Sequence, residues 1–183
     1  MNPEELAKAT GARIDRAREN HAWMCAAMDT FEINTPARQA AFLAQVGHES
    51  GGFKFINEIW GPTAAQARYE VRGAGDLGNV QPGDGVRYKG RGWIQLTGRD
   101  NYRRASERLS KRFSDCPNFE EDPGEVATSR WAAMTAAEFW FNAGCNKLAD
   151  EGRFEKITRV INGGLTGYPD RIARWEDAKE ALA

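Results

Sequence analysis

The sequence predicts a mainly α-helical protein with one small glycine-rich arm. Apolar residues recur at helical spacing along most of the chain, and glycines or prolines stand at the ends of these stretches. Residues 73–92 differ, because they hold seven glycines and Pro82, a composition typical of loops and hairpins. A chain of 183 residues can form one substantial core and is too short for two ordinary domains. We therefore expect a single domain over residues 1–183.

The bounds of the expected helices follow from residues that start or stop a helix. Asn2-Pro3-x-Glu5 is a capping box, while Thr35-Pro36 and Asp122-Pro123 each combine a cap with a first-turn proline. The expected helices cover residues 3–10, 13–31, 36–50, 101–113, 123–143, 154–161 and 169–182. Residues 53–60 are expected to be irregular, and Tyr88 to Thr97 to form a short β-hairpin arm.

The composition is that of a globular protein without a polyanionic partner. Hydrophobic residues make up 41% and charged residues 28% of the chain, and the net charge is −1 with a pI near 6.2. This balance does not indicate nucleic-acid binding, and attachment to an anionic cell wall would require a local basic patch. The acidic start of the chain predicts no secretory signal peptide, and no apolar run is long enough to cross a membrane. Cys25, Cys116 and Cys145 are odd in number and widely spaced, which predicts reduced thiols in a cytoplasmic protein.

Glu49 is the strongest candidate for a catalytic group. It lies three residues after Val46 and seven after Phe42, so the three share one face of the expected helix, directly before the glycines that end it. Partial burial and the negative end of the helix dipole both favour the protonated carboxyl, which is the form that a general acid requires. The alternative interpretation is a solvated glutamate at a helix end.

Two other motifs resemble metal-binding and nucleotide-binding patterns, but each lacks a required feature. His48-Glu49 begins the zinc-protease pattern HExxH, but Gly52 occupies the second histidine position, and the chain has only one other histidine, His21. Residues 73–78 spell GxGxxG without a preceding buried strand or a surrounding βαβ pattern, so a dinucleotide site is not indicated. We therefore expect no cofactor and no metal.

Further polar residues accompany Glu49 downstream. Glu58 and Glu70 come after the helix is broken, where the chain can cross a cleft and supply the second carboxylate that glycoside hydrolysis needs. Gln95 and Thr97 alternate with apolar neighbours as on a half-buried strand, and Asn162 lies at a helix end. For each of these three residues, capping of the local backbone is an equally good interpretation.

Several motifs in order resemble glycoside hydrolase family 19, and more specifically its short bacteriophage and prophage endolysins. They are His48-Glu49-Ser50-Gly51-Gly52, Tyr88-x-Gly90-Arg91-Gly92-x-Ile94-Gln95-Leu96-Thr97 with Asn101-Tyr102 after it, Ile161-Asn162-Gly163-Gly164, Thr35 to Gln45, and Tyr69-Glu70-x-Arg72 to Asn79. The resemblance covers residues 12–178. It implies a lysozyme-like fold of two helical lobes with a central substrate groove, and an inverting acid/base mechanism.

The resemblance also implies a role for individual residues. Glu49 matches the general acid, and Thr97 matches the residue that positions the attacking water. Arg171 matches a basic residue that sets the electrostatics of the catalytic site. The expected substrate-binding residues are His48, Glu70, Tyr88, Gln95, Asn101, Tyr102, Asn162 and Arg171.

The general base has two candidates. In plant chitinases of the family it lies about twenty residues after the acid, which matches Glu70, whereas the endolysin branch points to Glu58. Glu58 has apolar neighbours that can fix it against the core, while Glu70 lies beside Arg68 and Arg72 and is better explained as an ion-paired residue. We therefore take Glu58 as the base and keep Glu70 as the alternative.

The expected function is hydrolysis of the β-1,4 bond between N-acetylmuramic acid and N-acetylglucosamine in bacterial peptidoglycan, for host cell lysis. The alternatives are a family 19 chitinase and an inactive cell-wall-binding module. The expected partner is peptidoglycan, reached from the host cytoplasm through a membrane lesion made by a separate holin-type protein, with no nucleic acid, no membrane insertion and a monomeric chain. A wall-binding surface is expected in the groove or in a small helical lobe at about residues 100–140.

Overall fold

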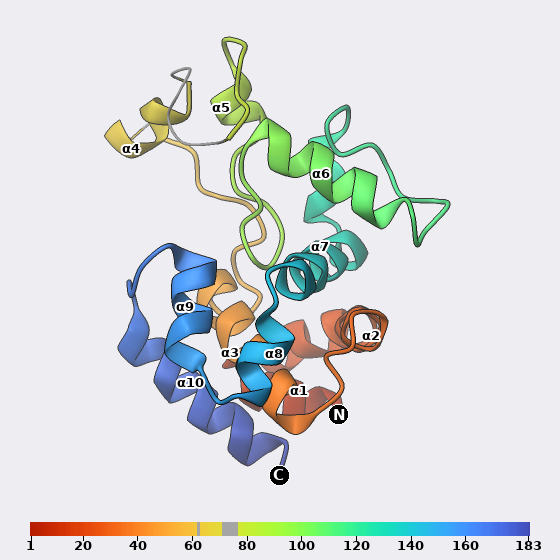
Figure 1. Cartoon of the computed structure of the whole chain (residues 1–183), viewed down its shortest axis with the longest axis vertical. Coiled ribbons are helices and arrows are strands. Elements are labelled where there is room, and N and C mark those ends of the chain that lie inside the picture. Colours follow the sequence, from red (N-terminus) through yellow and green to blue (C-terminus); the bar gives the residue numbers. More distant parts are fainter. Residues whose placement is uncertain (62, 71–76) are drawn as a thin grey trace.

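The computed structural model describes residues 1–61, 63–70 and 77–183 and is mainly helical (Figure 1). Its elements are α1 Pro3–Thr10, α2 Ile14–Thr30, α3 Pro36–Ser50, α4 Ala64–Ala67, η1 Arg68–Glu70, α5 Asp84–Arg87, α6 Arg99–Leu109, η2 Pro123–Ala127, α7 Ser129–Asn142, α8 Cys145–Asp150, α9 Phe154–Asn162 and α10 Tyr168–Ala181. The mainly helical class predicted from the sequence is confirmed.

The helix ends follow from the caps in the sequence. Asn2 and Glu5 form the predicted capping box, in which each side chain accepts the backbone N–H of the other residue at 2.8 and 2.7 Å. Thr35 accepts the backbone N–H of Arg38 at the start of α3, and Gly51 ends that helix with φ +57°. A left-handed φ is costly for residues with a Cβ, so the glycine after Ser50 fixes where the helix stops.

Two regions lie one above the other in Figure 1. The lower region, defined as residues 1–54 and 128–183, contains α1–α3 and α7–α10, and both chain ends lie there. The upper region, defined as residues 55–61, 63–70 and 77–127, contains α4, η1, α5, α6 and η2. α6 packs on α7, so these two helices join the regions.

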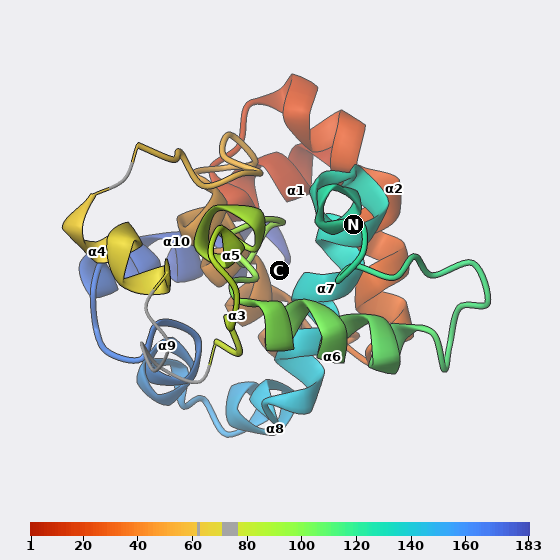
Figure 2. The same ribbon diagram turned by 90° about the horizontal axis from the view of Figure 1, so that it is seen from above.

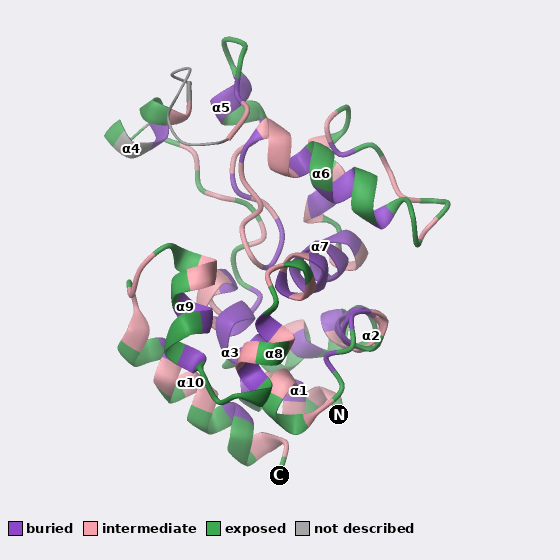
Figure 3. Cartoon of the chain, in the orientation of Figure 1, coloured by how far each residue is buried: buried purple, intermediate pink, exposed green. Residues whose placement is uncertain are grey.

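The lower region is built around α3. This helix packs against α1, α8, α9 and α10, and Figure 2 shows it near the middle of the projection. Figure 3 shows most of it buried, and Phe42 contacts Trp140 of α7 edge to face with ring centroids 5.3 Å apart. A Cβ on Gly47 would stand 2.4 Å from the carbonyl oxygen of Thr10, so this glycine allows α1 to lie directly against α3. The helix that carries Glu49 is therefore held on several sides.

A polar cluster around Asp84 holds the loop before α5 in the upper region. The carboxylate of Asp84 is buried and accepts hydrogen bonds from the backbone N–H groups of Val80 and Gln81 and from the guanidinium of Arg99. Burial alone would raise the pKa of Asp84, but these donors lower it below its usual value. The guanidinium of Arg99 also lies 4.8 Å from the ring centroid of Tyr88.

The expected β-hairpin arm is wrong in detail. Among the described residues, Tyr88 to Thr97 contain no regular strand, and the segment forms a tight turn closed by one antiparallel bridge between Arg91 and Leu96. Gly92 and Gln95 turn the chain with φ values of +76° and +56°, which are incompatible with an extended strand. Residues 73–76 of the glycine-rich stretch lie outside the described residues.

The other differences concern helix breaks and short helices. The long helix expected from Pro123 is divided, because Thr128 is extended with ψ 150° and separates η2 from α7. The short helices α4, α5 and α8 were not predicted, since four to six residues do not establish a helical period. In the described parts of the chain, no helix is long and apolar enough to cross a membrane.

Candidate active site

Glu49 lies in the last turn of α3 and pairs with a buried arginine from α10. Nη2 of Arg171 donates to Oε1 of Glu49 at 2.5 Å. The Arg171 side chain is 1% exposed and that of Glu49 is 19% exposed, so the guanidinium is enclosed while the carboxylate reaches the surface. The structure thus gives this carboxylate a direct cationic partner, which the sequence-based argument for a protonated carboxyl did not include. Arg171 was also expected to bind substrate, but at 1% exposed it lies enclosed beside Glu49 and offers no surface to a ligand.

A chain of hydrogen bonds fixes Arg171 in turn. Nη1 of Arg171 donates to Oε1 of Gln45, and Nε2 of Gln45 donates to Oγ1 of Thr158 at 2.9 Å. Nε of Arg171 donates to the carbonyl oxygen of Thr166 at 3.2 Å. Only Oε1 of Glu49 is engaged, and Oε2 has no hydrogen-bond partner among the described residues. Side chains from α3, α9 and α10 therefore orient one carboxylate and leave its second oxygen open.

Two residues that orient the site, Gln45 and Thr158, were not predicted from the sequence. A signal for Gln45 was present, because it is a polar residue within an apolar stretch, four residues before Glu49 and so on the same helix face. It is fully buried in the structure. Thr158 gave no comparable signal.

His48 is fixed at the edge of the site. Its Nδ1 lies 2.7 Å from Oδ2 of Asp170, and its ring covers Gly167, where a Cβ would stand 2.3 Å from Cε1. Although burial would raise the pKa of Asp170, hydrogen bonds from Arg174 and His48 lower it. The contact with Asp170 joins α3 to the start of α10. The His48 side chain is 23% exposed, so it still presents an edge to solvent.

Glu58 is a second carboxylate with a different environment. Oε1 accepts from Nε2 of Gln66 at 2.9 Å, and Oε2 accepts from the backbone N–H of Gly90 at 2.9 Å. Gln66 is buried and also donates to the carbonyl oxygen of Ile59 at 2.9 Å. An ionised carboxylate is an acceptor only, so two donors aimed at its two oxygens suit the ionised form. No local pattern in the sequence indicates Gln66 as the partner of Glu58.

The turn after Gly90 brings Gln95 close to Glu58 and carries two further polar side chains. A Cβ on Gly90 would stand 2.7 Å from Oε1 of Gln95 and 3.4 Å from Cβ of Glu58, so this close approach requires glycine. Nε2 of Gln95 donates to the carbonyl oxygen of Gly92 at 3.0 Å. The hydroxyl of Thr97 donates to the carbonyl oxygen of Gln95 at 2.9 Å, and Nδ2 of Asn101 donates to that of Thr97 at 2.7 Å. The Thr97 hydroxyl thus uses its one donor on local backbone, and all three side chains keep acceptor capacity for a ligand or a water.

Tyr88 and Tyr102 require a correction. Both were expected to contact substrate, but Tyr88 is 1% and Tyr102 0% exposed. Their hydroxyls donate to the carbonyl oxygens of Glu120 and Lys89, at 2.9 and 2.7 Å, and their rings meet edge to face. Burial also raises the pKa of Tyr102 to about 12. The two rings support the turn from below and offer no surface to a ligand.

Asn162 and Glu70 complete the expected set. Asn162 is exposed at the end of α9, and its Oδ1 accepts the backbone N–H of Thr166, whose carbonyl oxygen binds Arg171. Asn162 thus connects this loop to the partner of Glu49. The side chain of Glu70 lies outside what the structure describes, so its role as alternative base stays a prediction.

A cavity of about 400 Å³ lies beside the turn. Gln95, Thr97 and Asn101 line it from the upper region, and Phe139 and Ile161 line it from the lower region. Ile94 and Leu96 pack against the core as predicted, but they line the cavity as well, so polar and apolar side chains are not separated onto opposite faces of this segment. No group of three or more metal-ligating side chains occurs within residues 1–61, 63–70 and 77–183.

Comparison with known proteins gives relatives by sequence. A scan of protein-family models finds no match. A glycosyl hydrolase family 19 domain-containing protein of Haemophilus influenzae is 36% identical, and the alignment covers 73% of this chain and 74% of that protein. Two endochitinases of Arabidopsis thaliana are 37% and 36% identical over 68% of this chain, which spans 39% and 38% of their length.

Solved structures resemble the fold over nearly its full length. A bacterial family 19 chitinase superimposes with a TM-score of 0.76 and 22% identity, covering all of this chain and 94% of that one. Chitinase C of Streptomyces griseus superimposes with a TM-score of 0.74 and 22% identity over 99% of this chain and 76% of that chain. A class IV chitinase of Zea mays gives a TM-score of 0.61 and 26% identity over 87% of this chain and 78% of that chain. The lysozyme-like helical fold expected from the motifs is confirmed.

Proposed function

The chain belongs to glycoside hydrolase family 19, and from this premise we propose that it cleaves the β-1,4 bond between N-acetylmuramic acid and N-acetylglucosamine in bacterial peptidoglycan. The observation that supports glycoside hydrolysis best is the unequal treatment of two carboxylates. Glu49 keeps one oxygen open, whereas both oxygens of Glu58 accept hydrogen bonds. Two carboxyl groups in different environments suit an inverting hydrolase, because one gives a proton while the other takes one.

In the proposed reaction, Glu49 is the general acid. Its open Oε2 donates a proton to the glycosidic oxygen as the bond to the anomeric carbon breaks. Arg171 and Gln45 hold the side chain so that Oε2 keeps one direction, which reduces the motion needed to reach the transition state. The leaving sugar departs as a neutral alcohol, and Glu49 is left ionised beside Arg171.

Glu58 is the proposed general base. It takes a proton from a water that attacks the anomeric carbon from the face opposite the leaving oxygen, which inverts the configuration. Thr97 is the proposed second contact of this water, since its hydroxyl proton is already given to Gln95 and its oxygen can accept. Gln66 and Gly90 keep Glu58 oriented during the transfer.

Chitin is the second candidate substrate. Its support is the set of known chitinases that share the fold, while the support for peptidoglycan is the resemblance of the motifs to endolysins. An inactive wall-binding module is less well supported, because binding alone does not require a carboxylate aligned by a buried arginine.

For the biological setting we propose host cell lysis by a monomeric enzyme. In this proposal the protein collects in the host cytoplasm and reaches the wall after a separate holin-type protein permeabilises the membrane. Lysis from within, with and without such a protein in the same cell, is the corresponding assay.

Mass spectrometry of digested sacculi tests the substrate and the bond. We expect products with reducing-end N-acetylmuramic acid and faster release from sacculi than from chitin. Anhydro-muramic products would indicate a lytic transglycosylase, free stem peptides would indicate an amidase, and sugar release from chitin alone would establish the chitinase alternative.

A further inference from the structure

α6 and the residues after it form a local basic segment in a chain of net charge −1. Residues 99–113 contain six arginines and lysines and two acidic residues. Arg104 and Arg108 are three and seven residues after Asn101, so the three share one face of the helix. The same three side chains line the 400 Å³ cavity beside the turn. The basic face of α6 therefore lines the same cavity as Gln95 and Thr97.

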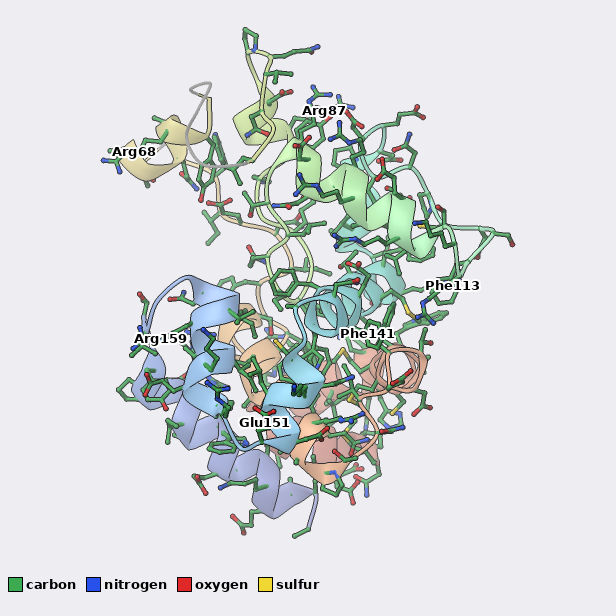
Figure 4. The ribbon with its side chains drawn as sticks, viewed as in Figure 1. Arg68, Arg87, Phe113, Phe141, Glu151 and Arg159 are labelled. Atoms are coloured by element: carbon green, nitrogen blue, oxygen red, sulfur yellow. The ribbon has the colours of Figure 1, made fainter. Side chains whose placement is uncertain are left out.

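A second cavity, of about 300 Å³, extends this surface. It shares Arg108, Glu138 and Asn142 with the first cavity and adds Lys111 and Arg112. We call the two cavities together the basic track. Its outer end lies next to α7, where the guanidinium of Arg112 is 5.8 Å from the ring centroid of Phe141, which is labelled in Figure 4.

One acidic residue lines the two cavities of the basic track. Glu138 of α7 is nearly buried, and its Oε1 accepts from Nη1 of Arg108 at 3.2 Å and from Nδ2 of Asn142. Burial raises the pKa of Glu138. Arg104 retains more freedom, because its side chain is 49% exposed and its ion pair with Asp100 is long, at 3.7 Å. Four cations against one enclosed carboxylate leave the track positively charged.

We propose that the basic track binds the peptide stems of peptidoglycan through their free carboxylates. The proposal rests on the function proposed above and names the part of the substrate that this surface recognises. The sugar backbone of chitin is uncharged, whereas each N-acetylmuramic acid unit carries a peptide whose acidic side chains and terminus are anionic. Arginine binds carboxylates in a forked geometry, and clustered like charges raise the local concentration of an anionic ligand. Arg104 and Arg108 are thus specificity-determining residues for peptidoglycan over chitin.

Arg104→Gln with Arg103→Gln as its control provides the test. The two arginines are neighbours on α6 with side chains 49% and 45% exposed, and each is paired with Asp100, but only Arg104 lines the track. Each protein is assayed on intact sacculi and on sacculi whose stems have been removed by an amidase. Thermal midpoints are recorded for both variants.

We expect Arg104→Gln to raise KM on intact sacculi about three- to fivefold at low salt, without changing kcat, because one exposed charge pair is lost. Arg104→Gln/Arg108→Gln is expected to raise it about tenfold. On stripped sacculi all variants should match the wild type, and Arg103→Gln should match it on both substrates. Equal losses for Arg103→Gln and Arg104→Gln, or equal losses on stripped sacculi, would overturn the proposal.

A binding measurement separates this proposal from the function on which it rests. A soluble tripeptide stem is titrated against the wild type and against Arg104→Gln. Weaker binding to the variant supports the track, and no binding by the wild type at millimolar concentration refutes it. If the wild type instead binds the peptide but cuts only chitin, the proposed cleavage of peptidoglycan is refuted, while binding of the peptide by the basic track is supported.

Discussion

The two regions each contain a buried arginine–carboxylate pair, but they enclose opposite partners. In the lower region Arg171 is 1% exposed and its partner Glu49 is 19% exposed. In the upper region Arg99 is 17% exposed and its partner Asp84 is 3% exposed. The first pair presents a carboxylate to the surface, while the second hides its carboxylate and presents the guanidinium.

This difference separates a group available for chemistry from a group that holds the fold. Asp84 accepts from the backbone of the loop before α5 as well as from Arg99, so its oxygens are used by the protein itself. Glu49 has one oxygen used by Arg171 and one left open. An arginine–carboxylate pair therefore serves two purposes, and which one it serves depends on whether the carboxylate or the guanidinium is buried.

Glu49→Gln should give the largest effect. The amide keeps the shape and still offers an oxygen to Arg171, but it cannot donate the required proton. We expect a loss of activity of roughly two to four orders of magnitude, with a thermal midpoint close to that of the wild type. Lysis of permeabilised cells at more than about a tenth of the wild-type rate by the folded variant would exclude Glu49 as the acid.

Arg171→Met removes the enclosed partner of the lower pair. Gln45 and Glu49 then lose their shared donor, and a partly buried carboxylate is left without its counter-charge. We expect unfolding free energy to fall by about 3–5 kcal/mol and activity to fall with it. Urea denaturation measures the first quantity. A stability equal to the wild type would mean that the ion pair contributes nothing to the fold.

Glu58→Gln is compared with Glu70→Gln to identify the base. The Glu58 variant should lose about two orders of magnitude in rate, because an amide cannot take the proton from water. Glu70→Gln should retain activity. Full activity of the Glu58 variant, together with an inactive but stable Glu70 variant, would reverse the assignment.

Asp84→Asn should lower the stability without changing the activity, and this is the smallest of the expected effects. The pKa of Asp84 lies below its ordinary value of 3.8, so its contribution is fully present above about pH 3.8 and is lost as the pH falls through the lowered value. At neutral pH we expect the variant to lose about 1.5–3 kcal/mol, and in strong acid we expect the two proteins to converge. Denaturation across pH measures this convergence, and kcat at low temperature should be unchanged.

Local signals in the sequence predicted much of the lower region. Capping residues and glycines fix the ends of α1, α3 and α9, because they act within one helical turn. Such local signals do not show where a residue departs from its usual backbone conformation. Gln95, in the expected hairpin, does so with φ +56°. A glutamine gives no local indication that it will adopt a left-handed turn.

The site was predicted in part. Glu49 and its burial follow from helical periodicity, and the resemblance supplied Arg171, but no rule of spacing links residues this distant in the chain. Tyr88 and Tyr102 were misplaced because a tyrosine can turn its hydroxyl to solvent or to a buried carbonyl, and only packing decides which. The basic track was not predicted either, because it requires α7 to pack against one face of α6.

The long separation between Glu49 and its partner has a consequence for synthesis of the protein. Arg171 follows Glu49 by 122 residues and Gln45 by 126, so α3 leaves the ribosome well before α10 exists. Contacts of such separation form late, after the intervening chain has folded. A nascent chain that has not reached α10 therefore holds Glu49 without the residue that aligns it. Alignment of this carboxylate waits until α10 has been synthesised.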